Sequence, residues 1–298
     1  MHFTNVHSLS VPRGKALFGL PPTRLAELLL VVLPELERRR TARLESRTAR
    51  KPKRVATAGR PRPVTPGHQV LKTLSYLRHN GQHEVGGALV GVRADTAENA
   101  FHEVVPVLRD LFPAEKWDAE QQGRRGAPTW TPAAVDLVSI ASFESPVRRP
   151  SQPERQTRVY SGKQKRPPLK TPLAPDQDGE IVTLAAGQRG PPAARKLYAA
   201  APPPEPMAAK PPRGDKGSHS QAHPELTTPH KQPRGGELTA EQKVENQEMA
   251  RQRIVVEPAS RRVKSFRLLR DDYRLALGLF PLIAAAVVGL IQFSQSAG

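Results

Sequence analysis

A run of arginines and lysines follows the first apolar segment of the chain and is chemically suited to bind phosphate. Its members are Arg38, Arg39, Arg40, Arg43, Arg47, Arg50, Lys51, Lys53 and Arg54. Only Glu45 opposes them within the run. A block of like charge is usually solvated and mobile, and it often binds phosphate. We therefore expect Arg38, Arg39 and Arg40 to contact the backbone of a nucleic acid.

A second basic segment follows, in which arginines alternate with prolines. Arg60 and Arg62 lie in the stretch Gly-Arg-Pro-Arg-Pro at residues 59–63. Proline keeps such a stretch extended, as in an arm that lies along a DNA groove. A linker that is basic without binding anything would have the same composition. Both interpretations of Arg60 and Arg62 stay open.

Residues 83–100 follow the spacing of a helix-turn-helix. Counted from His83, the fifth residue is the small Gly87, the eighth is the apolar Val90 and the ninth is Gly91. Gly91 can adopt the positive φ of a tight turn, and a small residue at Gly87 lets two helices approach. The second helix of such a motif enters the major groove of DNA.

The outward positions of that second helix carry side chains that can read DNA. They include Arg93, Thr96, Asn99 and His102. Asparagine pairs with adenine, and threonine reaches a phosphate or a thymine methyl group. Any two-helix hairpin could imitate the spacing, so DNA binding by these four residues is a hypothesis.

Composition narrows the classes of protein further. The 298 residues suggest about two domains, and the net charge of +18 makes a polyanion the first partner to consider. Nucleic acid is the leading candidate and an anionic membrane surface the second. The absence of cysteine excludes a disulfide-stapled scaffold, a thiolate zinc site and a cysteine nucleophile. With 32 prolines and 21 glycines, part of the chain is expected to stay disordered.

The first part of the chain is predicted to form the helices that position these side chains. A leucine-rich pattern predicts a helix over residues 23–37, bent or ended at Pro34. Apolar residues from Val70 to Leu77 share one face of a second helix. A short helix over residues 83–90 and a longer one over residues 95–112 complete the predicted helix-turn-helix.

The second half of the chain predicts short strands. Candidates cover residues 137–143, 157–160 and 180–185, and residues 176–179 have the composition of a hairpin turn. Pro172 lies inside the preceding arm, residues 169–174, with further prolines at both ends. Proline donates no ladder hydrogen bond, so we expect that arm to be a poor central strand.

The chain closes with two helical segments. Thr239 to Gln242 form a capping box that opens a helix running through Glu257 and restarting after Pro258. Residues 275–293 are apolar and uncharged, and basic residues precede them. A membrane tail anchor and a buried terminal helix both fit that pattern.

Several separate blocks, in the right order, resemble DDE-superfamily insertion-sequence transposases. Residues 70–113 resemble the N-terminal helix-turn-helix of that family. The resemblance continues at residues 135–150 (VDLVSIASFESPVRRP), 159–165 (VYSGKQK), 179–190, 213–216 (RGDK) and 233–269. It spans most of the chain from about residue 20 onward.

The resemblance implies an α/β (α+β mixed) fold with three parts. Residues 1–64 would be an N-terminal helix and basic linker, and residues 65–115 an all-α helix-turn-helix domain. Residues 130–298 would form an RNase H-like mixed sheet flanked by helices, with a Pro-rich and partly disordered stretch at 146–236. The final apolar helix would pack on this sheet, which makes a membrane anchor less favoured.

The resemblance also implies a catalytic site of three carboxylates that hold two divalent cations, Mg²⁺ or Mn²⁺. One cation activates the attacking oxygen and the other stabilises the leaving oxygen of a phosphodiester. The second acid falls on Asp215 and the third on Glu257, where Arg261 and Lys264 would receive DNA phosphates. Without the resemblance, Asp215 is an ordinary turn residue and Glu257 a solvated one. Three apolar residues precede Glu257, so we expect its surroundings to be partly buried.

The first acid of the family is absent, because Ala141 stands in its place. Glu144 points to the other face of the strand and is not expected to substitute. Pro258 stands where the family tends to have histidine, and in a helix interior it would cost about 3 kcal/mol. Pro168 and Pro172 replace polar positions of a strand. These departures favour a degenerate copy over a highly diverged active one.

Two functions from different classes follow. The first is a transposase, or its remnant, that binds element ends and is impaired in metal-dependent strand cleavage. The second is a non-catalytic DNA-binding protein derived from a transposase. The family implies double-stranded DNA as partner, a homodimer or larger assembly on DNA, no small-molecule substrate, and a cytoplasmic, nucleoid-associated location. A third hypothesis is a basic tail-anchored membrane protein, which solubility without detergent would eliminate. A ribosomal or chromatin-like basic protein fits the charge but explains neither the helix-turn-helix spacing nor the order of the blocks.

Overall fold

A computed structural model describes residues 8–50, 64–112, 141–147, 167–176, 179–184, 188–189, 228–232 and 235–295. The predicted strand at 157–160, the arginines 60 and 62, Asp215 and most of the Pro-rich stretch lie outside these residues. The chain divides into two compact units. Unit 1 comprises residues 1–112, 266–268 and 293–298, and unit 2 comprises residues 113–265 and 269–292.

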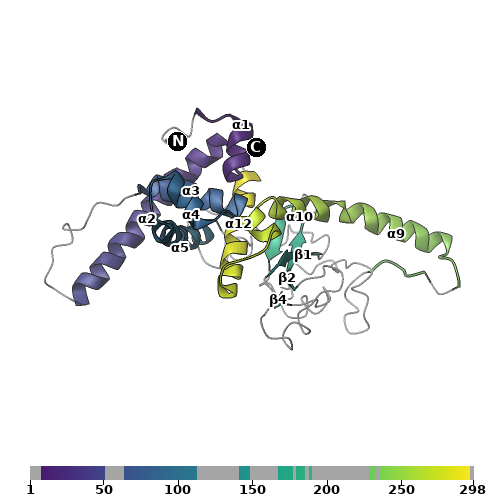
Figure 1. Cartoon of the computed structure of the whole chain (residues 1–298). Coiled ribbons are helices and arrows are strands. Elements are labelled where there is room, and N and C mark those ends of the chain that lie inside the picture. The colour runs from purple at the N-terminus through teal and green to yellow at the C-terminus, as the bar shows by residue number, and fades with distance from the viewer. Residues whose placement is uncertain are drawn as a thin grey trace. The chain divides into compact units, whose positions relative to one another are not determined.

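Unit 1 is a group of helices (Figure 1). Its elements are α1 (Val11–Phe18), α2 (Pro22–Arg50), α3 (Pro66–His79), α4 (His83–Leu89) and α5 (Ala94–Leu111). The core is formed by the apolar faces of the longer helices. Fully buried members are Leu25, Leu28 and Val32 of α2, Leu74 and Leu77 of α3, and Phe101, Val104 and Leu108 of α5.

Helix α2 is much longer than the sequence predicts. It does not end at Pro34 but continues through the basic run to Arg50. Proline at position 34 removes one hydrogen bond to the carbonyl of Leu30. The Leu30 side chain is 76% exposed, so water can reach this part of the helix. The basic run is therefore helical up to Arg50, beyond the predicted end of the helix at residue 37.

Helices α3, α4 and α5 match the predicted elements closely. Thr65 caps α3 by accepting a hydrogen bond from the His68 amide. A short turn joins α4 to α5, and there Gly91 has a φ of +72°. A Cβ on Gly87 would lie 2.6 Å from the carbonyl oxygen of Val92. The expected reasons for glycine at both positions, a positive φ and a close approach, are confirmed.

Unit 2 contains a small antiparallel sheet. Its strands are β1 (Ala141–Pro146), β2 (Pro168–Pro175), β3 (Ile181–Leu184) and β4 (Gln188–Arg189). β1 pairs with one edge of β2, and both β3 and β4 pair with β2 as well. The turn between β2 and β3 is the predicted one, with Gly179 at a φ of +76°. The fold thus combines helices and a sheet, and within the described residues every paired strand is antiparallel.

The prediction that the Pro-rich arm would make a poor central strand is wrong. β2 is the middle strand and carries Pro172 opposite Ser142 of β1. On the other edge, β2 pairs with β4 at Leu169 and Lys170, and with β3 from Leu173 onward. Residues 185–187, which lie between these two pairings, are outside the described residues. The other prolines lie at the strand ends.

The helix that bears Glu257 is divided, but not where the sequence predicts. α9 (Ala240–Gln252) opens with the predicted capping box of Thr239 and Gln242. A 3₁₀ turn η4 (Arg253–Val255) follows, and then α10 (Val256–Lys264). Pro258 lies in the first turn of α10, where a missing amide donor costs little. The expected penalty of a proline in a helix interior is therefore not incurred, because the break lies upstream.

The chain ends in α11 (Arg267–Arg270), η5 (Leu277–Leu279) and α12 (Phe280–Gln295). Of the residues that the structure describes, 277–295 form the one single helix long and apolar enough to cross a membrane, with a mean hydropathy of 2.0. Half of it is buried within the protein. Phe280 packs edge-on against Tyr273 at 5.1 Å, as a core helix of a folded domain would. α1 and α2 pass the same test only when taken together across a 52° bend.

Candidate nucleic-acid interface and metal site

The structure places four predicted DNA-binding residues along one helix. Arg93 is the N-cap of α5, and Thr96, Asn99 and His102 follow at intervals of three residues. Arg93, Asn99 and His102 are exposed and Thr96 is half-buried. Ala97 and Ala100 face the core. α5 therefore presents the predicted base-reading side chains to solvent.

Acidic residues accompany these side chains on α5. Asp95 lies 3.9 Å from the Arg93 guanidinium, and Glu98 lies 3.8 Å from Nε2 of His102. The surface of α5 is thus mixed in charge and not uniformly basic. Its contribution to DNA recognition would depend on shape and hydrogen bonding more than on net charge.

The predicted phosphate-binding arginines of α2 all have carboxylate partners. Arg38 forms two hydrogen bonds of 2.7 Å with Glu35, and Arg40 lies 3.7 Å from Glu37. Arg39 contacts Glu35 at 2.6 Å and also Asp110 of α5 at 2.7 Å. Arg39 is therefore a link between α2 and α5, whereas Arg38 is the more exposed of the two.

A second arginine of the run joins the same two helices. Arg43 of α2 contacts Glu103 of α5 at 3.0 Å. Together with the Arg39 contact, it holds α2 beside α5 over about one turn of α2 and about two turns of α5. Part of the basic run thus stabilises the packing of unit 1.

These ion pairs shift the titration of their acids. The hydrogen bond from Arg38, helped by Arg39 and opposed by burial, lowers the pKa of Glu35 to about 2. Burial works against ionisation of Asp110, but hydrogen bonds from Arg109 and Arg39 lower its pKa nonetheless. Both acids are charged at neutral pH and hold their arginines in place.

A buried lysine lies where α3, α4 and α5 meet. Lys72 is 8% exposed, and its ammonium donates to the carbonyl of Ala97 in α5. It also lies 3.3 Å from Nδ1 of His83, the first residue of α4. Burial lowers the pKa of Lys72 to about 8, although the charge of Glu98 acts in the opposite direction. Sequence reasoning missed this residue; its signal was a lysine inside the buried stretch of α3.

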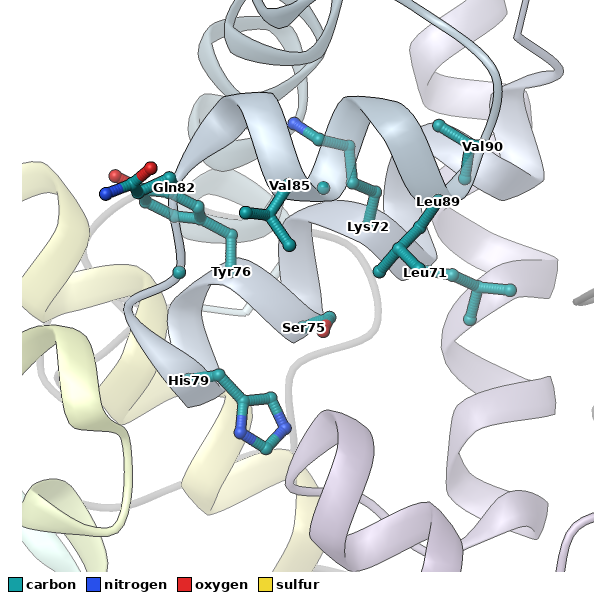
Figure 2. Close-up of a pocket in the computed structure, with 11 residues that line it drawn as sticks. Leu71, Lys72, Ser75, Tyr76, His79, Gln82, Val85, Leu89 and Val90 are labelled. Atoms are coloured by element: carbon teal, nitrogen blue, oxygen red, sulfur yellow. The ribbon is translucent and has the colours of Figure 1, made fainter.

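A hollow of about 250 Å³ lies between α3 and α4 (Figure 2). Leu71, Val85, Leu89 and Val90 make much of its wall apolar, and His79 stands at one end. Val85 and Leu89 are more than half exposed. The hollow is smaller than the pockets of roughly 300–1,000 Å³ that usually hold small ligands. We assign no ligand to it.

Of the two carboxylates expected at the metal site, Glu257 alone lies within the described residues. Ala141 is the first residue of β1, opposite Leu173 of β2. Glu257 of α10 is 73% exposed and lies 3.5 Å from Arg261, so the expectation of a partly buried setting is wrong. Asp215 lies outside the described residues.

No nearby acid replaces the missing one in the part of the chain that the structure describes. Glu144 of β1 pairs across the sheet with Lys170, with their charged atoms 3.8 Å apart. No group of three His, Cys, Asp or Glu side chains there could hold a metal ion. The described residues thus do not fit a two-metal site, whose hard cations need several carboxylate oxygens.

The two basic residues predicted beside Glu257 lie on the same helix. Arg261 is 76% exposed and Lys264 is half-buried, both on α10. Arg262, between them, bonds the carbonyl of Gly179 in the β2–β3 turn. Arg262 therefore fixes α10 to the β2–β3 turn, while Arg261 is exposed beside Glu257 and Lys264 is half-buried.

Comparison with known proteins identifies the family. The DDE superfamily endonuclease family matches residues 140–292, about half of the chain. The chain is also 32% identical over 176 residues to a probable transposase for insertion sequence element IS702 from Microchaete diplosiphon. That match covers 54% of this chain and 58% of the relative. No solved structure matches. The chain belongs to the DDE superfamily of endonucleases.

Proposed function

We propose that this protein is a transposase-type DNA-binding protein that recognises element ends and is impaired in strand cleavage. The observation that carries the proposal is alanine at position 141. The family match begins at residue 140, so Ala141 lies on the first strand of the matched region. A methyl group cannot ligate a cation, and losing one of the shared carboxylates should disable two-metal chemistry.

DNA binding is proposed for α4 and α5 of unit 1. The turn at Gly91, the close approach at Gly87 and the exposed face of α5 support a helix-turn-helix. Asn99 and Thr96 would contact base edges, and Arg93 and His102 the flanking phosphates. Arg38 and Arg40 on α2, and Arg60 and Arg62 beyond it, would add phosphate contacts.

Unit 2 is proposed to be the remnant of an RNase H-like catalytic domain. A four-stranded antiparallel sheet, with the Glu257-bearing helix α10 in contact with β1 and β2, supports that assignment. Asp215 and Glu257 would be the two surviving acids, able at most to hold one Mg²⁺ or Mn²⁺ weakly. Arg261 and Lys264 would contact DNA phosphates. We propose no strand-cleavage step through a metal for this chain.

The test of the proposal is plasmid nicking with Mn²⁺ by the full chain and by Ala141→Asp. The control is Ala141→Asn, which has nearly the same size but no charge. Cleavage by Ala141→Asp alone would establish that one missing carboxylate disables the site. Cleavage by the unchanged chain would contradict the proposed impairment. If no variant cuts while DNA binding persists, the alternative of a wholly non-catalytic DNA-binding protein is favoured.

DNA recognition needs its own test. Duplexes that the full chain binds can be selected from a randomised library. The affinity of the chain for a selected duplex and its affinity for a random duplex are then measured over a range of salt concentrations. Both affinities should fall steeply with salt, because each neutralised phosphate releases a counterion. A flat salt response, or no enriched sequence, would overturn recognition of element ends.

A further inference from the structure

From the middle of α3, the buried Lys72 contacts the first turns of α4 and α5. From α3 its ammonium reaches the Ala97 carbonyl, one turn into α5, and the ring of His83 at the start of α4. The stem passes close to α4, where a Cβ on Gly86 would lie 3.2 Å from Cε of Lys72. Figure 2 shows the nitrogen directed away from Ser75 and His79, which line the hollow.

Aromatic rings pack against one another at this junction. The rings of Tyr76 and His83 stack with centroids 4.1 Å apart and planes 9° from parallel. Phe101 of α5 meets Tyr76 edge-on at 5.0 Å and His83 at 5.7 Å. The imidazole that receives the Lys72 contact is therefore held from both α3 and α5.

The N-terminus of α5 has no side-chain cap. Its N-cap Arg93 makes no side-chain capping bond. Ala97, whose carbonyl Lys72 binds, lies between Thr96 and Asn99, the two residues proposed to contact bases. We propose that Lys72 is a positioning residue that fixes the first turns of α5 and thereby orients Thr96 and Asn99 toward DNA. This inference rests on the proposed function of α5.

The buried ammonium of Lys72 destabilises the folded state, because burial of a charge is unfavourable. The charged or titratable groups that face it are His83 from α4, Glu98 from α5 and Tyr76 from α3 itself, and His102 lies near Glu98. Since Lys72 has a pKa of about 8, its charge disappears as the pH rises through that value. The fold then gains stability while the hydrogen bonds to Ala97 and His83 weaken.

The experiment compares Lys72→Met with Lys15→Met, which removes an equal charge at an exposed site on α1. The readout is the ratio of affinities for the selected and the random duplex. Lys72→Met should keep or raise the melting temperature. It should lower the ratio of the two affinities roughly tenfold, which is the effect expected from the loss of about one base contact. Lys15→Met should leave the ratio unchanged. A residue with only a structural role would lower the melting temperature and both affinities together.

The wild-type chain provides a second readout that needs no variant. Its selectivity ratio should fall between about pH 7 and pH 9 as Lys72 loses its proton, while thermal stability rises. The chain has no cysteine to titrate in this range.

If Lys72→Met retains the full ratio, the inference fails and DNA recognition stands. If Lys72→Met does not fold, a flat wild-type pH profile overturns the inference. If the wild-type chain selects no sequence, the proposed function fails first.

Discussion

Gly87 and Val92 are in contact across the turn between α4 and α5. The Val92 amide donates to the Gly87 carbonyl at 2.9 Å, and a Cβ on Gly87 would lie 2.6 Å from the Val92 oxygen. The nearest obstacles are backbone atoms, so no side-chain rotation can relieve the clash. The geometry of the turn therefore depends on the absence of one methyl group.

Gly87→Ala should destabilise unit 1 by about 1–3 kcal/mol, the usual cost of overpacking a close contact. The measurement is chemical denaturation of the full chain followed by helical circular dichroism. Gly81→Ala is the control, since a Cβ there meets no atom within 4 Å. Equal stabilities for the two variants would show that the turn can widen without cost.

Arg39→Gln and Arg38→Gln should separate a packing role from a DNA-binding role. Arg39 bonds Asp110 of α5, so its loss should cost about 1–2 kcal/mol of unfolding free energy. Its loss should leave the salt dependence of DNA binding unchanged. Arg38→Gln should cost less stability than Arg39→Gln, because the Arg38 side chain is more exposed, and it should lower the salt slope by about one. The reverse pattern would mean that the assignments of Arg38 and Arg39 must be exchanged.

Glu35 should make the stability of unit 1 depend on pH in the acid range. Its pKa is lowered from 4.5 to about 2, so the folded state holds fewer protons than the unfolded chain. The stabilisation is complete above about pH 4.5 and is lost as the pH falls toward 2. The difference between the stability–pH curves of wild type and Glu35→Gln should lie in that window. Glu45→Gln, an exposed site on the same helix, is the control and should give a nearly parallel curve.

The sequence predicted the elements that depend on local signals. The α3–α5 helices, the glycine turn, the Asp176–Gly179 hairpin turn and the capping box at Thr239 are encoded within a few residues, and each is confirmed. Predictions that depended on distant partners were less accurate. Pro172 lies in the central strand β2, opposite Ser142 of β1, and no local pattern reveals which strands pair with that segment.

The candidate site was predicted only in its parts. The exposed face of α5 follows from helical periodicity, and the family resemblance was confirmed by the match over residues 140–292. The link from Arg39 to Asp110 and the burial of Lys72 depend on how α2, α3 and α5 pack. Spacing alone treats Arg39 as another solvated charge, and it gives no reason to select Lys72.

Pro258→Ala should extend the helix that carries Glu257. In the native chain, the 3₁₀ turn Arg253–Val255 separates α9 from α10, because the proline ring would clash with the carbonyl of Ile254 in a continuous helix. Alanine removes that clash and restores an amide donor at position 258. The helical circular dichroism should increase by about one turn, roughly four residues, and the amides near Ile254 should exchange more slowly. Pro281→Ala is the matched control, because Pro281 is the second residue of α12 and interrupts no helical hydrogen bond. Unchanged exchange near Ile254 would mean that the break is fixed by packing of unit 2 rather than by the proline.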